Sequence, residues 1–265
     1  MFHENHDGGC VYLTADALSG SRHCFSTRLG GVSGGALCSL NLGVGRGDAL
    51  ENVIKNYEIL GNCVGFRPED TVFTKQVHTD TVCVVTKRDC GTGLFRPQQT
   101  PCDALICNEP GVALCAFTAD CVPILLFDPV KKAVGAVHAG WRGTALGIVK
   151  KTVLSMRQAF GCSPDDICAA IGPHIGPCHF LTDEDVPNAM KNALGEAAER
   201  AVSVRGEKYA VDLGLLNRIW LEQAGVRQID ESNCCTACDP ERFWSHRIVG
   251  QSRGAMAAVI MLEGL

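Results

Sequence analysis

The sequence predicts a fold that mixes α-helices and β-strands, of the α/β or α+β class. Short apolar runs, typical of buried strands, are concentrated between residues 104 and 138. Segments in which apolar residues recur at helical spacing lie on both sides of this region. The sequence contains no internal repeat and no low-complexity tract, so strands interleaved with helices are expected. At 265 residues the chain has room for one large domain or two small ones.

The N-terminal region is expected to begin with loops and to continue with a helix. Glycine and serine are frequent in the first fifty residues, especially over residues 30–35, which favours a loop-rich segment. From residue 52 to residue 60, apolar side chains recur at helical spacing, and Gly61 follows as the expected end of the helix.

The central region is expected to supply most of the strands. Residues 72–73 and 81–85 favour a pair of strands, with His78 in the segment that connects them. Asp128 and Pro129 then predict a turn, because proline fixes its own φ angle, and this turn joins two apolar runs into a hairpin. The expected core strands cover residues 104–107, 112–118, 122–127 and 133–137.

The second half of the chain is expected to alternate helices and strands. A helix with Thr144 as its N-cap is predicted to continue to residue 160, and residues 167–171 form the next buried strand. A second helix runs from about residue 212, capped by Asp212, to residue 223. Residues 256–262 close the chain as a strand.

Composition and charge favour small-molecule partners. The net charge is −5 and no long basic run occurs, which argues against a broad electrostatic contact with nucleic acid. The longest apolar windows are shorter than the roughly 18 residues of a transmembrane helix, and the N-terminus lacks a secretory pattern, so no membrane partner is expected. The protein is therefore expected in the cytoplasm, with its 16 cysteines reduced.

Three residues at the ends of apolar runs are candidate metal ligands. His78 follows a predicted strand, Cys121 lies between two strands, and His138 ends a strand before a helix. Two imidazoles and one thiolate would leave the fourth tetrahedral position of Zn²⁺ open, which distinguishes catalytic from structural zinc. The spacing matches no compact metal motif, so a buried thiol and two hydrogen-bonded core histidines are the alternative interpretation.

Two further motifs have a functional and a structural interpretation. Arg142 lies between Gly140 and Gly143 at the start of a predicted helix, where an anion would find a fixed positive fork and free N–H groups. Alternatively, the glycines serve a tight turn and Arg142 faces solvent. Cys235 and Cys238 form a C-x-x-C pair, but a structural zinc needs a second pair of ligands, so idle thiols are the expected state.

Several motifs together resemble the laccase-domain family, also called the polyphenol oxidase or purine nucleoside phosphorylase family. The resemblance extends in motif order from about residue 27 to residue 254. The motifs are Gln76-Val77-His78, Thr118-Ala119-Asp120-Cys121-Val122-Pro123, His138-Ala139-Gly140-Trp141-Arg142-Gly143, the run from Ile171 to Cys178, and Cys235-Thr236 before Phe243-Trp244-Ser245.

This resemblance implies one domain over residues 1–265, an α+β sandwich of two mixed sheets flanked by helices. It also implies a mononuclear Zn²⁺ or Cu²⁺ site on His78, Cys121 and His138. Family members are associated with phosphorolysis of adenosine, inosine and methylthioadenosine, and with adenosine deamination. Bacterial relatives are linked to editing of a peptidoglycan precursor, a UDP-MurNAc-amino acid, and to phenol oxidation.

The leading hypothesis is a metal-dependent purine nucleoside phosphorylase with a deaminase side activity, working as a monomer or weak homodimer. Cys121, His138, Asp120 and Arg142 are the expected catalytic residues. Asp120 is expected to orient a ligand imidazole or move a proton, or else to act as a loop carboxylate. Arg142, Lys75 and Arg28 would offset negative charge, and Asn41 and Gln76 would donate hydrogen bonds to sugar or base.

Other activities use the same atoms. Cys121 and His138, 17 residues apart around a predicted hairpin, would suit a thiol amidase as nucleophile and base. A purely structural metal is disfavoured, because structural zinc sites usually have four protein ligands and only three are predicted here. A multicopper oxidase is also disfavoured, because it needs clusters of histidines and the eight histidines of this chain are scattered. His246 and Leu181 depart from the family pattern of Ser-Tyr-Arg and aromatic-Glu-Val, so substrate preference stays open.

Overall fold

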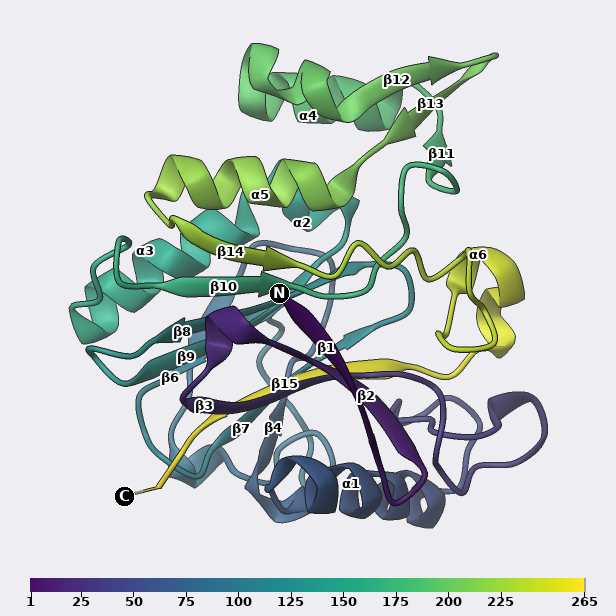
Figure 1. Ribbon diagram of the computed structural model, residues 1–265, viewed down its shortest axis with the longest axis vertical. Coiled ribbons are helices and arrows are strands. Elements are labelled where there is room, and N and C mark those ends of the chain that lie inside the picture. The colour runs from purple at the N-terminus through teal and green to yellow at the C-terminus, as the bar shows by residue number, and fades with distance from the viewer. Residues whose placement is uncertain (265) are drawn as a thin grey trace.

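The computed structural model describes residues 1–264, and its main feature is a pair of six-stranded sheets packed face to face (Figure 1). The first sheet has the strand order β1-β2-β3-β15-β7-β4, and only β4 is parallel to its neighbour. Its strands are β1 (Phe2–Asp7), β2 (Cys10–Ala15), β3 (Ser21–Ser26), β15 (Met256–Leu262), β7 (Ala113–Thr118) and β4 (Thr71–Phe73).

The second sheet has the order β14-β10-β8-β9-β6-β5 and is also mixed, because both of its edge strands are parallel to their neighbours. Its strands are β14 (Gln228–Glu231), β10 (Cys168–Ile171), β8 (Val122–Asp128), β9 (Ala133–Ala139), β6 (Ala104–Cys107) and β5 (Val82–Val84). A small third sheet contains β11 (Leu181–Thr182), β13 (Lys208–Val211) and β12 (Val202–Arg205).

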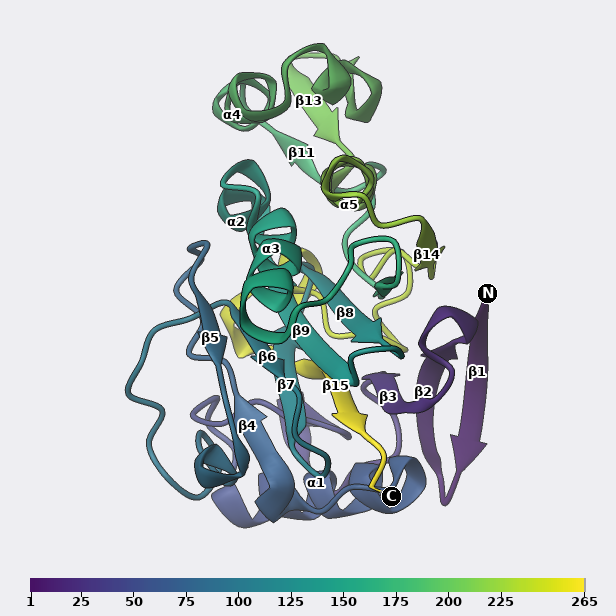
Figure 2. The same ribbon diagram turned by 90° about the vertical axis from the view of Figure 1, so that its left-hand side faces the viewer.

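Helices cover the outer faces of both large sheets, as Figures 1 and 2 show. Helix α1 lies against the first sheet, whereas α3 and α5 lie against the second. The short α2 leads into α3, and α4 packs beside the small sheet. The helices are α1 (Leu50–Val64), α2 (Trp141–Ala145), α3 (Ile148–Phe160), α4 (Asp185–Leu194), α5 (Leu213–Ala224) and α6 (His246–Val249).

The alternation of side chains along each strand explains this layering. In β8, Ile124 and Leu126 pack toward α3 and α5, whereas Leu125 and Phe127 pack toward the first sheet. A strand buried on both faces has apolar residues at every position, which is why this region lacks the alternating pattern of a half-exposed strand. The expected sandwich of two mixed sheets flanked by helices, in the α+β class, is confirmed.

Several predicted elements are confirmed closely. Strand β15 has the predicted bounds, and β8 and β9 form the predicted hairpin. Helix α5 begins after Asp212, whose side chain accepts a hydrogen bond from the backbone N–H of Leu215, and it ends before Gly225 in the left-handed conformation.

The predicted pairing of the strands on either side of His78 is wrong. Strand β4 pairs with β7 in the first sheet, and β5 pairs with β6 in the second. The segment that carries His78 therefore crosses from one sheet to the other. Short apolar runs indicate strands but do not specify their partners, because long-range pairing depends on the rest of the fold.

Two predicted helix boundaries are also wrong. Gly61 lies inside α1, which continues to Val64; glycine is needed there because a Cβ would overlap the carbonyl oxygen of Phe66. Thr144 is not an N-cap but a buried residue within α2, whose N-cap is Gly140. Gly147, with a φ of 72°, separates α2 from α3.

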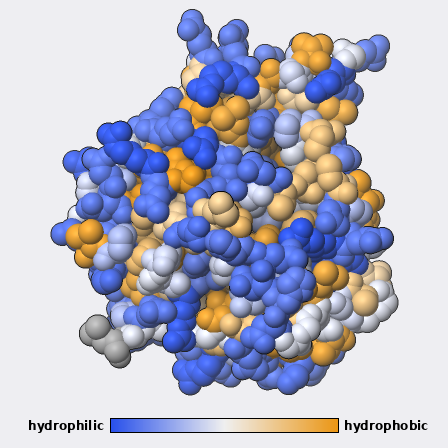
Figure 3. All heavy atoms as spheres, in the orientation of Figure 1, coloured by the Kyte–Doolittle hydropathy of each residue, from blue (hydrophilic) through white to orange (hydrophobic). Residues whose placement is uncertain are grey.

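The N-terminal segment is more regular than predicted. Strands β1, β2 and β3 occupy much of the first 26 residues, although residues 27–49 are the expected loop region apart from one short 3-10 turn. None of the helices within residues 1–264 is long and apolar enough to cross a membrane. On the face drawn in Figure 3, hydrophobic residues form small groups separated by hydrophilic ones.

Candidate metal centre and active site

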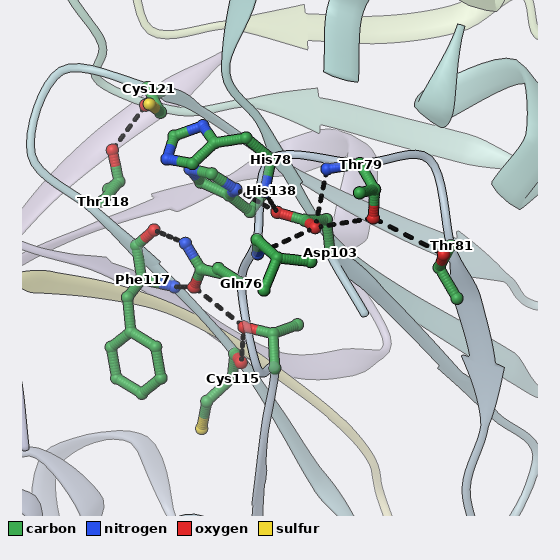
Figure 4. A network of polar contacts seen from close by, with 12 residues as sticks. Gln76, His78, Thr79, Thr81, Asp103, Cys115, Phe117, Thr118, Cys121 and His138 are labelled. Atoms are coloured by element: carbon green, nitrogen blue, oxygen red, sulfur yellow. Dashed lines mark hydrogen bonds and ion pairs between the residues drawn. The ribbon is translucent and has the colours of Figure 1, made fainter. Parts of the chain in front are cut away.

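Three predicted metal ligands meet at one end of the sandwich. Between β4 and β5 the chain crosses from the first sheet to the second, and it crosses again between β7 and β8. Because β4 and β7 are parallel, both crossings leave the first sheet at the same edge. His78 lies in the first crossing and Cys121 in the second. One ligand atom from each of His78, Cys121 and His138 lies within 4.8 Å of the other two (Figure 4).

The β8–β9 hairpin brings Cys121 and His138 together. In its antiparallel register, Val122 is opposite Ala139 and Pro123 is opposite His138. Cys121 comes directly before β8, so its side chain lies next to the end of β9. The rings of His78 and His138 meet edge to face, with centroids 4.9 Å apart.

Asp103, directly before β6, holds both histidines in position. Its carboxylate accepts hydrogen bonds from the backbone N–H groups of Val77, His78 and Thr79, and it contacts Nδ1 of His138 at 2.8 Å (Figure 4). His78 has a φ of 59°, an uncommon conformation for a non-glycine residue that this carboxylate holds in place. With Nδ1 engaged, Nε2 of His138 is the nitrogen left for a metal.

Burial and charge act in opposite directions on this group. Burial lowers the pKa of His138, but the neighbouring Cys121 and the Asp103 carboxylate outweigh it and raise the pKa to about 9. Burial likewise raises the pKa of Asp103, but His138 and the backbone N–H donors lower it to about 2. The pKa of His78 is lowered by burial and by the nearby positive charge of His138, which favours the neutral, metal-binding imidazole.

The three side chains fit a metal ion both chemically and sterically. Imidazole nitrogen and thiolate sulfur suit Zn²⁺ or copper. A carboxylate behind one imidazole is the usual outer support of a metal-binding histidine. Gly140 leaves space beside the ligands, because a Cβ at this position would lie 2.6 Å from Nδ1 of His78 and 3.3 Å from Sγ of Cys121.

A cavity of about 500 Å³ opens beside these ligands. It includes His78 and Cys121, and its other walls combine positive charge with apolar surface. The remaining lining residues are Arg46, Ala119, Asp120, Trp141, Arg142, Ile175, Phe180, Leu213, His246, Arg247, Gln251 and Arg253. A second cavity, of about 120 Å³, contains all three ligands and shares Arg46 and Arg253 with the first.

Arg253 is the most unusual of these arginines. Its Nε is buried and has no hydrogen-bond partner within the part of the chain that the structure describes. Burial, together with the charge of Arg46, lowers the pKa of Arg253 to about 10. A partly buried guanidinium with an unpaired, buried Nε–H near a second guanidinium favours an anionic ligand, because an anion would interact with both groups.

The cavity brings together some of the other predicted site residues. Arg142, at the start of α2, lines it with its guanidinium 4.2 Å above the centre of the Trp141 ring. Asp120 also lines it, with a φ of 92°, but its carboxylate accepts hydrogen bonds from Oγ1 of Thr236 and the backbone N–H of Arg247. The imidazole of His138 is thus oriented by Asp103 rather than by Asp120.

Gln76 lines two smaller cavities that neighbour the main one, and Lys75 lines one of them. Gln76 joins the two crossings: its amide donates to the carbonyl oxygen of Phe117 and accepts from the N–H of Phe117 and Oγ1 of Thr74 (Figure 4). It also lines the cavity that contains the three ligands. Lys75 is exposed, and its Nζ contacts the carbonyl oxygen of Gln99.

Arg28 and Asn41, two predicted substrate-binding residues, are not among the residues that line these cavities. Arg28 donates to the carbonyl oxygens of Pro240 and Cys38 and stacks 3.7 Å above the centre of the Trp244 ring. Asn41 is fully buried and holds the backbone of Gly43 and Ala255. Both side chains organise loops in this structure, and their contact with substrate stays a prediction.

Sequence reasoning missed several residues of the site. Asp103 precedes an apolar strand with no motif around it, and Arg46 and Arg253 are isolated basic residues next to glycines. Their positions depend on which strands become neighbours, and no local pattern reveals this. Of the two departures from the family pattern, His246 lines the cavity, whereas the Leu181 side chain is 40% exposed.

Comparisons with known proteins find relatives that match most of the chain. A family profile described as "Multi-copper polyphenol oxidoreductase laccase" matches residues 22–263. The purine nucleoside phosphorylase YlmD of Bacillus subtilis (strain 168) is 36% identical over 244 residues, which are 90% of this chain and 87% of that protein. The purine nucleoside phosphorylase YfiH of Escherichia coli (strain K12) is 36% identical over 239 residues, 90% of this chain and 93% of that protein.

Solved structures show the same fold. The crystal structure of YlmD from Geobacillus stearothermophilus superposes with a TM-score of 0.91 at 35% identity and covers 98% of both chains. That of the hypothetical protein YfiH from Bacillus licheniformis also gives a TM-score of 0.91, at 33% identity and 97% coverage of both chains.

Proposed function

This chain belongs to the multi-copper polyphenol oxidoreductase laccase family, and on that premise we propose that it is a metal-dependent purine nucleoside phosphorylase. It would cleave adenosine, inosine or methylthioadenosine to the base and a ribose 1-phosphate. The observation that carries the proposal is the cavity of about 500 Å³, where two of the three ligands, His78 and Cys121, meet four arginines and two aromatic side chains. Several relatives at similar identity are named purine nucleoside phosphorylase.

The arginines provide the phosphate side of the proposed site. Arg46, Arg142, Arg247 and Arg253 line one cavity that has Asp120 as its only acidic lining residue. Guanidinium groups bind phosphate oxygens in pairs, and the charge of the bound phosphate would balance their mutual repulsion. We assign the main phosphate contact to Arg253, because its buried Nε has no hydrogen-bond partner among residues 1–264.

Aromatic side chains provide the base side. Trp141 and Phe180 line the same cavity and offer flat apolar surface to a purine ring. A volume of about 500 Å³ falls within the roughly 300–1,000 Å³ usual for small-molecule sites. The arginines then hold the phosphate as one of its oxygens forms a bond to ribose C1′ and the C1′–N bond to the base breaks.

The remaining assignments concern the ligands and their supports. His78, Cys121 and His138 would hold the metal, which when bound acts as a Lewis acid that polarises a substrate or water oxygen. Asp103 keeps the Nε2 atom of His138 directed at the site. The Asp120 carboxylate accepts a hydrogen bond from the backbone N–H of Arg247. Asp120 is therefore a positioning residue for the phosphate side.

Product analysis tests the proposal directly. Purified protein incubated with adenosine and inorganic phosphate is expected to release adenine and ribose 1-phosphate, with no base released when phosphate is omitted. Arg253→Gln is expected to raise the KM for phosphate by roughly 10–100-fold, since a hydrogen bond to a charged group is lost. The matched control is Arg242→Gln, another partly buried arginine that lies outside the cavity lining. Base release without phosphate would overturn the proposal.

Adenosine deamination is a second proposed activity. Three protein ligands leave one tetrahedral position for a water molecule, which is the arrangement a hydrolytic metal enzyme needs. Ammonia release from adenosine in phosphate-free buffer, lost in Cys121→Ser, is the expected result. Ammonia release that persists in this variant would count against it.

The proximity of Cys121 and His138 also suits the predicted thiol amidase acting on a peptidoglycan precursor. Chelation separates the two chemistries. A metal enzyme loses activity with a chelator and regains it with Zn²⁺, whereas a cysteine nucleophile keeps its activity and is trapped by iodoacetamide.

We propose Zn²⁺ as the metal, with Cu²⁺ as the alternative, because imidazole nitrogen and thiolate sulfur both bind Zn²⁺ and three protein ligands leave the fourth position that a catalytic zinc keeps open. Metal analysis of protein purified without added metal distinguishes the two ions. We also propose a cytoplasmic location, since a thiolate ligand must stay reduced. A monomer or weak homodimer is proposed and is checked by light scattering.

A further inference from the structure

A second group of metal-ligand side chains lies outside the triad. It consists of Cys178 and His179, in the loop after β10, and Cys235 and Cys238, in the loop after β14. One ligand atom from each residue lies within 4.8 Å of the others. The C-x-x-C pair thus has the second pair of ligands that sequence reasoning required, brought from 57 residues upstream.

The distances within this group match a tetrahedron around one zinc ion. With Zn–S near 2.3 Å and Zn–N near 2.0–2.1 Å, tetrahedral ligands lie roughly 3.8 Å apart for two sulfurs and about 3.5 Å apart for sulfur and nitrogen. Here Sγ of Cys178 lies 3.5 Å from Sγ of both Cys235 and Cys238. Nδ1 of His179 lies 3.3, 3.8 and 3.5 Å from the sulfurs of Cys178, Cys235 and Cys238.

Backbone contacts hold the two loops in this arrangement. The N–H of Gly176 donates to Sγ of Cys235 at 3.2 Å, a contact that stabilises a thiolate. His174 and its neighbours pair with the second loop: the N–H of His174 donates to the carbonyl oxygen of Cys234, and the N–H of Thr236 donates to that of His174. The ligands are therefore positioned by main chain on both sides.

We propose that Cys178, His179, Cys235 and Cys238 bind a second, structural Zn²⁺. Three thiolates and one imidazole complete a tetrahedron, and sites closed by four protein ligands are structural rather than catalytic. None of the four residues belongs to the triad, so the two metals bind separately. The inference rests on the distances above and does not depend on the proposed activity.

The position of this zinc gives it a role in shaping the cavity. Ile175 and Phe180, on either side of the first ligand pair, both line the cavity. The carbonyl oxygen of His179 accepts a 2.6 Å hydrogen bond from Arg247, and Thr236, between the other two ligands, holds Asp120. The zinc would therefore hold together two loops beside the cavity, the first of which contributes Ile175 and Phe180 to the cavity lining.

Metal content tests the proposal. Wild-type protein, purified under reducing conditions with zinc and then desalted, is expected to contain two zinc ions per chain. Cys238→Ser and Cys121→Ser are each expected to contain one, and the double variant none. The matched control is Cys234→Ser, which changes a neighbouring thiol outside the group and is expected to keep two.

Cobalt substitution provides a second readout that does not need a variant. Full loading with Co²⁺ is expected to give the thiolate charge-transfer absorption of a three-sulfur site in addition to that of a one-sulfur site. A wild-type content of one zinc that Cys238→Ser leaves unchanged would overturn the proposal. So would a disulfide between Cys178 and either other cysteine in the freshly purified, unreduced protein, shown by alkylation and mass spectrometry.

Discussion

The carboxylate of Asp103 is fully buried and makes four contacts that support the proposed metal site. It accepts three backbone N–H groups from the segment around His78 and one contact from the ring of His138. Two ligands from distant parts of the chain thus share one support. A change at Asp103 is therefore expected to move both histidines, although Asp103 is not itself a ligand.

Asp103→Asn is expected to lower zinc affinity of the triad by roughly 10–100-fold, the usual effect of losing an outer support of a ligand. The matched control is Asp128→Asn. Asp128 is also fully buried and accepts hydrogen bonds from the backbone N–H groups of Val130 and Lys131. It lies at the β8–β9 turn, at the end of the hairpin far from the ligands. Competition with a chelator of known affinity measures both. Equal loss in the two variants would contradict the assigned role.

Gly140→Ala tests the space around the ligands. The φ of Gly140 is −68°, so alanine fits the backbone, but its Cβ would lie 2.6 Å from Nδ1 of His78. We expect triad zinc content and activity to fall at least tenfold, with the fold intact by circular dichroism. In the control Gly135→Ala, on the preceding strand β9, the Cβ meets its neighbours at 3.5 Å, and unchanged zinc content is expected. Normal zinc binding in Gly140→Ala would refute the steric argument.

At the scale of elements, α5 holds the short helix that carries Trp141 and Arg142. Nε1 of Trp220 donates to the carbonyl oxygen of Thr144, and the amide of Asn217 donates to its hydroxyl. Thr144 was predicted to cap a helix; in the structure its hydroxyl and carbonyl oxygens instead accept hydrogen bonds from α5. Helix α2 is only five residues long, so its position depends on this tertiary support rather than on helix propensity.

The N-cap of α5 gives a prediction at this scale. Asp212→Ala removes the hydrogen bond to Leu215 and is expected to lower the free energy of unfolding by about 1 kcal/mol, or Tm by roughly 2–4 °C. Asp212→Ser restores a side-chain acceptor and should recover most of this loss. Thermal unfolding of both variants measures it, and an equally large loss in the serine variant would show that capping is not the cause.

At the scale of the whole molecule, the fold was predictable where information is local. The β8–β9 hairpin joins neighbouring runs through a proline turn, and this hairpin already places Cys121 beside His138. The separation of β4 and β5 into different sheets was not predictable, because nothing in either short run specifies a partner more than twenty residues away. Asp103 was missed for the same reason.

The resemblance to a family supplied what local patterns could not. It strengthened the prediction that His78, Cys121 and His138 bind one metal and implied two mixed sheets, and both large sheets are mixed as expected. It did not transfer every contact: Arg28 and Asn41 support loops here, and Arg253 was not singled out. The second cysteine group was also missed, because its two halves come from loops that only the folded chain brings together.

Protonation of His138 links the site to the stability of the metal-free protein. Its pKa is raised from 6.5 to about 9 in the folded state, so its contribution is complete below pH 6.5 and is lost as pH rises through about 9. The pKa of Asp103 is lowered from 3.8 to about 2, so its contribution is present above pH 3.8 and is lost as pH falls through about 2. The pair therefore stabilises the metal-free chain most between these limits, from about pH 4 to 6.5.

With a chelator present, the Tm difference between wild type and His138→Gln is expected to be largest near pH 6 and to shrink by pH 9. The energy involved is on the order of 3 kcal/mol, because each unit of pKa shift corresponds to about 1.4 kcal/mol. Comparing the two proteins at each pH removes the contribution of other titrating thiols and amines. With Zn²⁺ bound, the metal takes the place of the proton on His138, so the wild-type decline between pH 6.5 and 9 should disappear. A metal-free difference that stays constant over this range would show that His138 is already neutral in the folded protein.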